Sequence, residues 1–227
     1  MTDAGNGPTA PDGRLILLLI GAVGAGKGTQ AGMLSAELGV PHLASGNLFR
    51  QALRDGTPLG ERARGYMERG DLVPDDVTIG MFMEELAKPE AARGAILDGF
   101  PRTVGQAGAL DRTLADQGER IARAIYIDVP TDELVSRVSG RSVCPKCGTV
   151  YHDTTDPPRV PGICDRDGTP LVRRDDDRPE VVRARLDKQV PPMLEVVEHY
   201  RRAGSLARID GSQPIADVLR DIKAALA

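Results

Sequence analysis

The sequence predicts an α/β protein built on a doubly wound parallel sheet. An apolar run from Leu15 to Ile20 is followed by a glycine-rich loop and then by a helical pattern from Gln30 onward. Further short apolar segments alternate with helical stretches, which favours parallel strands joined by right-handed crossovers. The composition changes between residues 140 and 177, where all three cysteines lie among prolines and aspartates. This segment, the cysteine lobe, is therefore expected to form outside the sheet.

The expected elements alternate regularly from the N-terminus. Residues 1–13 contain almost nothing to bury, so they are predicted to be a flexible tail. Strands are expected at 15–20, 40–44, 95–98, 122–129 and 206–209. Helices are expected from Gln30, from Ser45 as an N-cap, at 58–70, at 75–87, after a cap at 131–133, and at 214–226. This order places the Gly21 loop, Asp98 and Asp210 beyond the carboxyl ends of strands, where ligands bind in such folds.

Composition excludes several classes of protein. The chain has 227 residues, 41% of them apolar, and no apolar run approaches the roughly 18 residues of a membrane span. The net charge of −4 and the absence of tryptophan argue against a nucleic-acid partner. We expect a cytoplasmic protein that contacts no membrane.

The loop after the first strand has the pattern of a triphosphate site. Gly21-x4-Gly26-Lys27 places backbone N–H groups and one lysine where they can bind phosphate oxygens. The magnesium-binding hydroxyl that usually follows the lysine is replaced by Gly28. We expect the loop to bind a nucleoside triphosphate through Gly24, Ala25, Gly26, Lys27, Gly28 and Thr29.

The spacing G-x4-G-K-G-T resembles the loop of nucleoside monophosphate kinases, adenylate kinase above all. Residues 45–50, 70–74 and 98–102, with Gln106 one helical turn later, also resemble adenylate kinase motifs in order and spacing. The resemblance extends from Leu15 to the C-terminus. It implies reversible phosphoryl transfer from Mg-ATP to AMP, giving two ADP, in a monomer.

The resemblance also implies the site residues. The monophosphate side would consist of Ser45, Arg50, Val73, Gly99, Arg102, Gln106, Arg174 and Arg185. The ATP side would add Arg137, Arg141, Val150, Tyr151 and Gln213 to the loop. The residues implied in catalysis are Lys27, Asp98, Arg102, Arg137, Arg174 and Arg185.

Several of these residues also have interpretations from position. Arg137 and Arg141 are four apart on a predicted helix, so they would share one face. Asp98 would either orient the magnesium shell through water or cap the turn formed by residues 99–102. The arginines expected to be merely solvated are Arg173, Arg178 and Arg183. In the family, an acidic run usually occupies the place of residues 177–180. The departure from it here concerns the ion pairs expected at the hinge of the lobe more than it concerns catalysis.

The cysteine lobe carries a metal-binding pattern. Cys144-x2-Cys147 is followed after sixteen residues by Cys164-x2-Asp167, a zinc-ribbon spacing with aspartate in the last place. Three thiolates and one carboxylate suit a tetrahedral, structural Zn²⁺. A disulfide, three plain structural thiols, or His152 as the fourth ligand are the alternatives. Some adenylate kinases resemble this pattern in their lid.

The implied organisation has a P-loop core, an inserted AMP-binding helical segment and a small zinc-ribbon-like lid. The core would comprise residues 14–44, 74–139 and 178–227, with the AMP-binding segment at 45–73 and the lid at 140–177. A UMP/CMP kinase or a GTP:AMP phosphotransferase would share the loop. A zinc-ribbon nucleic-acid-binding ATPase is the alternative from another class.

Overall fold

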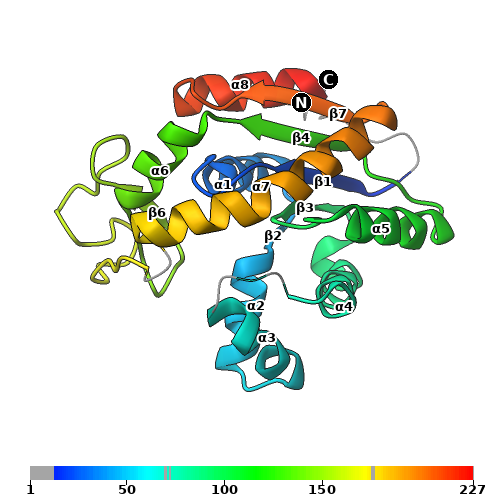
Figure 1. Cartoon of the computed structure of the whole chain (residues 1–227), viewed down its shortest axis with the longest axis horizontal. Coiled ribbons are helices and arrows are strands. Elements are labelled where there is room, and N and C mark those ends of the chain that lie inside the picture. Colours follow the sequence, from blue (N-terminus) through cyan, green and yellow to red (C-terminus); the bar gives the residue numbers. More distant parts are fainter. Residues whose placement is uncertain (1–12, 69–70, 72, 175–176, 227) are drawn as a thin grey trace, which may run out of the picture.

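Figure 1 shows the computed structural model, which describes residues 13–68, 71, 73–174 and 177–226. The predicted tail lies outside the described residues apart from Gly13. A five-stranded sheet in the order β2-β3-β1-β4-β7 forms the centre, and every pairing in it is parallel. Its strands are β1 (Leu15–Ile20), β2 (His42–Ala44), β3 (Gly94–Asp98), β4 (Arg123–Asp128) and β7 (Leu206–Asp210). The predicted doubly wound parallel sheet is confirmed.

The strand β1 is the central strand of the sheet. All of its residues are apolar, which suits a strand whose two faces are both covered. Ile16, Leu17 and Leu18 are fully buried. Leu15 pairs with Gly94 on β3, whose φ is 128°. A Cβ at Gly94 would lie 2.0 Å from the carbonyl oxygen of Leu15, so this strand pairing requires glycine.

Alternate residues of β1 belong to two apolar clusters, one on each face of the sheet. The helices that supply both clusters and their surroundings are α1 (Lys27–Leu38), α2 (Ser45–Arg54), α3 (Pro58–Glu68), α4 (Asp75–Leu86), α5 (Val104–Asp116), α6 (Thr131–Ser139), α7 (Pro179–Arg202) and α8 (Ile215–Leu226), with a 3-10 turn η1 (Pro89–Ala91). Ile16 and Leu18 pack with α4, α5 and the end of α7. Leu17 and Leu19 pack with α1, α6, the start of α7 and α8. Because successive side chains of β1 point to opposite faces of the sheet, this one strand packs against both helical layers.

The longest helix, α7, was not anticipated from the sequence. Its 24 residues include Pro191 and Pro192, which disfavour a helix interior by about 3 kcal/mol each. Val182 near its start is fully buried in one cluster, and Tyr200 near its end is 1% exposed in the other. Packing against both sides of the fold outweighs the local preference.

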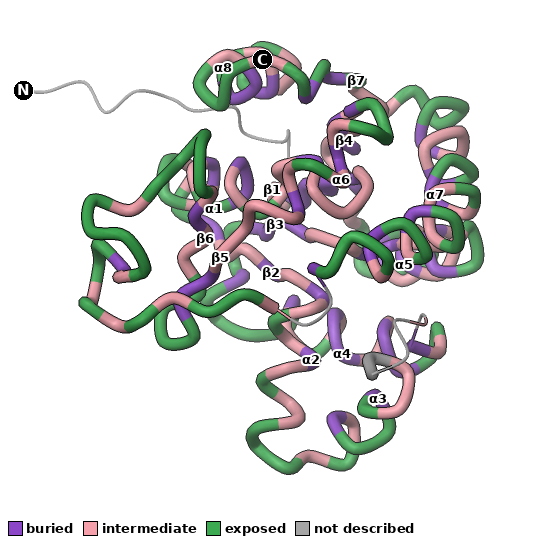
Figure 2. Tube along the Cα trace, turned by 60° about the vertical axis from the view of Figure 1, so that its left-hand side comes forward, coloured by how far each residue is buried: buried purple, intermediate pink, exposed green. Residues whose placement is uncertain are grey.

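Two parts project from the sheet. The α2–α3 segment extends away from β2. Its two helices approach each other closely, because a Cβ at Gly60 on α3 would lie 2.3 Å from the carbonyl oxygen of Ala52 on α2. The cysteine lobe has its own antiparallel pair, β5 (Arg141–Val143) and β6 (Val150–His152). Figure 2 shows that both parts are largely exposed or intermediate, whereas the central strands β1 and β3 are mostly buried.

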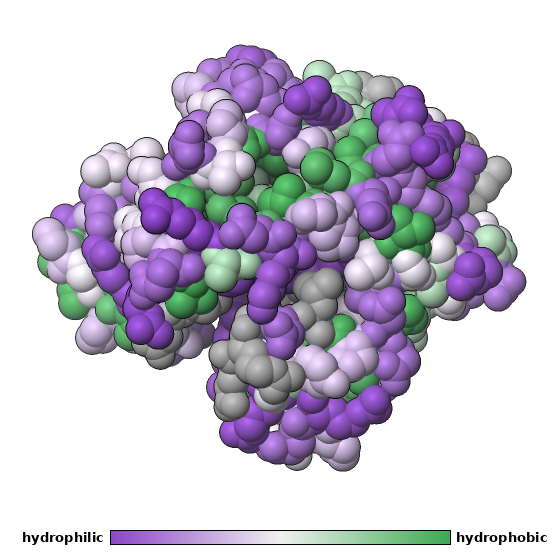
Figure 3. Space-filling view, in the orientation of Figure 1, coloured by the Kyte–Doolittle hydropathy of each residue, from purple (hydrophilic) through white to green (hydrophobic). Residues whose placement is uncertain are grey.

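The surface in the view of Figure 3 is hydrophilic over most of the α2–α3 segment, and hydrophobic residues gather near the centre of this face. Among the described residues, no helix combines the length and the apolar character that crossing a membrane would need.

Candidate functional site

The glycine loop between β1 and α1 depends on glycine at two positions. Gly24 and Gly26 have φ of 87° and 88°, in the left-handed region that other residues avoid. A Cβ at Gly24 would also lie 2.7 Å from Cγ2 of Val138 and 2.9 Å from the carbonyl oxygen of Leu134, both on α6. The loop is therefore held closely against α6, with its amide groups at the start of α1.

Lys27, the first residue of α1, folds back over this loop. Its Nζ donates to the carbonyl oxygens of Gly21 and Ala22, at 2.8 and 2.9 Å. Burial lowers the pKa of Lys27 from 10.5 to about 8, although the negative charge of Asp98 opposes the shift. The lysine therefore remains mostly protonated at neutral pH.

Lys27 belongs to a group of cations. The charges of Arg102, Arg141 and Arg185 each lower its pKa further. Burial, with the charge of Arg185, also lowers the pKa of Arg102. These cations come from α1, from the loop after β3, from β5 and from α7. Their mutual repulsion shows that the fold gathers positive charge where polyanions could neutralise it.

Asp98, at the end of β3, provides negative charge within this group. Burial raises its pKa, but the hydrogen bond from His42 and the charges of Lys27 and Arg102 outweigh burial, so the net shift is downward. Nε2 of His42 lies 3.1 Å from Oδ2 of Asp98. A Cβ at Gly28 would lie 3.9 Å from the same oxygen, which places the carboxylate beside the glycine loop.

The contacts of Asp98 bear on both of its interpretations. In the described residues, its carboxylate bonds to His42 and makes no hydrogen bond to the turn of residues 99–102. An ionised carboxylate that faces the glycine loop suits a magnesium hydration shell better than a turn cap. The contact of His42 with Asp98 could not be predicted from the sequence, because only the parallel pairing of β2 with β3 brings the two side chains together.

Arg102 follows the turn after β3, which contains a cis peptide bond between Phe100 and Pro101. Its Nε donates to the carbonyl oxygen of Gly99 at 2.7 Å, and its Nη2 donates to Oγ of Ser45 at 3.2 Å. These bonds fix the guanidinium between the sheet edge and α2.

Ser45 differs from its expected role as an N-cap. The helix α2 begins at Ser45 itself, and Ala44 stands at the cap position without a side-chain hydrogen bond. The buried Oγ of Ser45 instead accepts from Arg102 and would lie 2.7 Å from a Cβ at Gly99. Ser45 is therefore not the N-cap of α2, and its hydroxyl lies beside Arg102.

Of the other expected monophosphate residues, Gln106 contacts Arg102 directly. Gln106 is 2% exposed, and its Oε1 accepts from the backbone N of Arg102 at 2.7 Å. Val73 is buried just before α4. Arg50, on α2, donates to Oδ1 of Asn47 at 2.7 Å and so lies along its own helix.

The expected shared helix face of Arg137 and Arg141 is wrong. The helix α6 ends at Ser139, and Arg141 begins β5, because Gly140 stands at the C-cap between them. Arg137 donates to Glu133 at 2.6 Å and to the carbonyl oxygen of Gly211 at 2.9 Å. Arg141 forms a two-point ion pair with the buried carboxylate of Asp177.

The remaining expected residues lie on three segments. Arg185 is on α7, and Arg174 lies where the chain returns from the cysteine lobe, its carbonyl oxygen accepting from the backbone N of Asp177 at 3.1 Å. Gln213 follows β7 and donates to Oδ2 of Asp221 at 3.0 Å. Residues 175 and 176, which follow Arg174, lie outside the described residues.

Val150 and Tyr151 are on β6. The Tyr151 side chain is buried, accepts from the backbone N of Asp165 at 2.8 Å and lies 3.5 Å from Sγ of Cys164. This side chain therefore supports the cysteine lobe.

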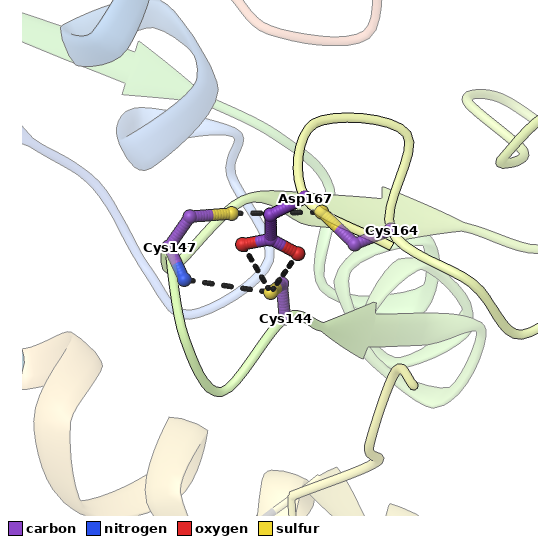
Figure 4. Close-up of side chains that lie close together, drawn as sticks. All are labelled: Cys144, Cys147, Cys164 and Asp167. Carbon is purple, nitrogen blue, oxygen red and sulfur yellow. Dashed lines mark hydrogen bonds between the residues drawn. The ribbon is translucent and has the colours of Figure 1, made fainter. Parts of the chain in front are cut away.

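Figure 4 shows four side chains of the cysteine lobe pointing toward one another. One ligand atom from each of Cys144, Cys147, Cys164 and Asp167 lies within 4.8 Å of the others. The cysteines are free of disulfides, and Sγ of Cys147 lies 3.5 Å from Sγ of Cys164. A hydrogen bond from the backbone N of Thr169 holds the pKa of Asp167 well below its usual range. An ionised carboxylate among three thiols fits a tetrahedral metal.

The alternative fourth ligand, His152, lies outside this cluster. Its Nδ1 accepts from the backbone N of Thr154 at 3.2 Å, and its ring packs where a Cβ of Gly140 would be. Arg173, expected to be only solvated, donates to the carbonyl oxygen of Ser139 and to Asp153 nearby. Both residues belong to the base of the lobe.

Known proteins resemble this chain over nearly its whole length. The family model described as adenylate kinase matches residues 19–205. The adenylate kinase of Exiguobacterium sibiricum is 47% identical over 210 residues, covering 92% of this chain and 98% of that protein. The adenylate kinases of Oceanobacillus iheyensis and Staphylococcus epidermidis are each 45% identical, covering 92% and 91% of this chain and 98% and 96% of theirs.

Proposed function

The chain belongs to the adenylate kinase family and is an ATP:AMP phosphotransferase, and we propose that Lys27, Asp98 and the surrounding arginines form its transfer site. The observation that carries this proposal is the cluster of Lys27, Arg102, Arg141 and Arg185 around one ionised carboxylate. Two nucleotides placed end to end would bring several negative charges together. A ring of cations is what lets them approach.

On the ATP side, the loop amides and Lys27 bind the β- and γ-phosphates. Arg137 and Gln213 support this assignment by position, since the hydrogen bond from Arg137 to Gly211 brings α6 against the loop that carries Gln213. Arg141 and the backbone of residues 150–151 complete this side from the lobe.

On the AMP side, Arg102 supplies a planar guanidinium that its bond to the carbonyl oxygen of Gly99 already orients. Arg50 and Arg185 add positive charge, and Arg174 joins them from the return segment. Ser45, Val73, Gly99 and Gln106 surround the nucleoside.

The transfer needs no general base. The phosphate of AMP has a second pKa near 6, so its attacking oxygen is mostly anionic at neutral pH. That oxygen forms a bond to the γ-phosphorus, the bond from the γ-phosphorus to the β-bridging oxygen breaks, and two ADP result. Catalysis then consists of alignment and charge neutralisation by the residues above.

The donor set around Asp98 fits magnesium. Asp98 is an ionised oxygen ligand beside the glycine loop, and Gly28 leaves room where other loops carry a hydroxyl. Asp98 would orient the hydration shell through water, and bound Mg²⁺ would neutralise charge on the phosphates.

The cysteine lobe is proposed to hold one structural Zn²⁺ through Cys144, Cys147, Cys164 and Asp167. Four protein ligands leave no open coordination position, so the metal would stabilise the lobe and take no part in chemistry. Metal analysis of the purified protein tests this: one zinc per chain is expected, and a metal-free lobe with full thermal stability would contradict it.

We further propose that residues 140–177 act as a lid and 45–73 as the AMP-binding segment of a cytoplasmic monomer. Free thiols in a metal site suit a reducing compartment. A lobe that closes over both substrates would exclude water as a competing nucleophile. Light scattering coupled to gel filtration tests the oligomeric state, and the mass of a single chain is expected.

A coupled assay with Mg-ATP and each monophosphate tests the reaction. Rapid ADP formation is expected with AMP and much slower formation with UMP or CMP. GTP should replace ATP poorly. Equal rates with UMP or CMP would favour a different monophosphate kinase. ATP hydrolysis that no monophosphate accelerates would overturn the proposal.

A further inference from the structure

We propose that Asp75 is a positioning residue that fixes the orientation of the Gln106 amide, and that this orientation selects bases carrying an amino group beside an unprotonated ring nitrogen. The inference rests on the proposed function, in which Gln106 lies at the base of AMP. It adds to the site a residue, Asp75, that lies 31 positions from Gln106 in the sequence.

Both ends of the Gln106 amide are engaged. Oε1 accepts from the backbone N of Arg102 at 2.7 Å, and Nε2 donates to Oδ1 of Asp75 at 2.7 Å. A backbone N–H can only donate and a carboxylate can only accept, so the partners themselves determine which end is oxygen. Gln106 is 2% exposed, so bulk water has little access to either contact.

Asp75 is held in place by a second contact. Its Oδ2 accepts from Oγ1 of Thr103 at 3.2 Å, and Oγ1 of Thr103 accepts from the backbone N of Gln106 at 3.1 Å as the N-cap of α5. The carboxylate therefore connects the first turn of α4 with the first turn of α5. Both oxygens therefore hold Gln106. Oδ1 accepts from the Gln106 side chain directly, and Oδ2 holds the Thr103 hydroxyl that caps the Gln106 backbone.

The engaged amide retains one N–H on Nε2 and one lone pair on Oε1. Adenine offers the complement, because its amino group donates and the neighbouring ring nitrogen accepts. Hypoxanthine, guanine and uracil offer the reverse, a carbonyl oxygen beside a ring N–H. Binding them through this amide would require it to flip, which would place oxygen against the Asp75 carboxylate and NH₂ against the Arg102 N–H.

The test compares AMP with IMP, which differs from it only in this edge of the base. We expect the wild-type protein to prefer AMP in kcat/KM by at least about a hundredfold. In Asp75→Asn, the new amide can present either a donor or an acceptor, so only the Arg102 N–H still opposes the flipped orientation of Gln106. Selectivity should fall by about tenfold or more, mainly through a higher KM for AMP and a lower one for IMP.

Asp76→Asn is the matched control. Asp76 is in the same first turn of α4, so this change removes the same charge from the helix terminus. Its side chain is 71% exposed and pairs with Arg62, away from Gln106. This variant should keep the wild-type preference for AMP over IMP.

The outcomes separate this inference from the proposed function. A wild-type protein that uses IMP as well as AMP, or an Asp75→Asn variant that folds and keeps the full preference, would overturn the inference while leaving the kinase intact. If no monophosphate accepts a phosphoryl group, the proposed function fails. Should Asp75→Asn not fold, Asp75→Ser tests the same contact, and calorimetric binding of AMP and IMP supplies a readout independent of turnover.

Discussion

The transfer site and the cysteine lobe hold their polar side chains in place by different means. Around Lys27, the sheet and its helices bury two large apolar clusters, and the charged residues lie at the edge of that packing. In the lobe, the buried cluster consists of Cys144, Tyr151 and Cys164, with Leu171 beside it. Half of the lobe's own core is thus made of candidate ligands. Where apolar area is scarce, metal ligation has to replace hydrophobic burial.

This difference predicts that changes in the two regions separate activity from stability. Substitutions at the sheet edge should impair turnover and leave folding intact, since the clusters beneath are untouched. Substitutions among the lobe ligands should first destabilise the lobe.

Lys27→Ala should lower kcat by about 1000-fold or more, because it removes a preorganised charge at the transferred phosphate. Its melting temperature should stay within a few degrees of wild type. Steady-state kinetics and thermal unfolding measure both. Arg183→Ala, an exposed residue of α7, is the control and should behave as wild type. Near-normal turnover in Lys27→Ala would end the proposed mechanism.

Arg102→Lys should lower kcat/KM for AMP by about 100-fold. Lysine keeps the positive charge but loses the planar fork that bonds to Gly99 and Ser45. The KM for ATP should change little, because Arg102 is assigned to the other nucleotide. An equal loss for both substrates would contradict that division of the site.

Cys164→Ser should release the metal and lower the melting temperature of the lobe by about 10 °C or more. Asp167→Cys should keep the metal, since a thiolate also suits a tetrahedral site. Metal analysis and calorimetry check both variants. Lys146→Ala, an exposed residue between two ligands, is the control. A Cys164→Ser variant with unchanged metal content would show that the cluster is not the ligand set.

The smallest expected effect concerns pH. Burial lowers the pKa of Lys27 from 10.5 in the unfolded chain to about 8 in the fold, so the unfolded state binds the proton more tightly. Between these values, the stability of the ligand-free protein should rise with pH relative to Lys27→Met, by a few degrees in melting temperature. ATP binding should weaken above pH 8 as the charge is lost. A parallel pH dependence in the two proteins would show that Lys27 titrates normally.

Much of the candidate site followed from local sequence. The left-handed conformations of Gly24 and Gly26 and the closeness of Asp98 to the glycine loop agree with what strand ends and glycine spacing predict. The four clustered lobe residues are those that the Cys-x2 spacing named. Such predictions succeed because glycine conformation, strand ends and each Cys-x2 turn are specified within a few residues, even where the parts they bring together are distant in sequence.

Other features could not be predicted, because they depend on contacts distant in sequence. The helix α7 forms in spite of Pro191 and Pro192 because two apolar clusters bury its sides. The placement of Arg141 on β5 came from a helix end at Gly140 that charge spacing did not reveal. His42 meets Asp98 only after two strands pair.

The sequence by itself determined the parallel α/β core, the phosphate loop and the four lobe residues that gather, because strand alternation, glycine conformation and short ligand spacing are local properties. Only the tertiary structure decided the partners of each charged group. Asp98 is ionised because His42, Lys27 and Arg102 outweigh its burial, and the Gln106 amide is oriented because α4 brings Asp75 to it. The physical reason is that pKa values and hydrogen-bond partners depend on distances through space, which the order of residues along the chain does not specify.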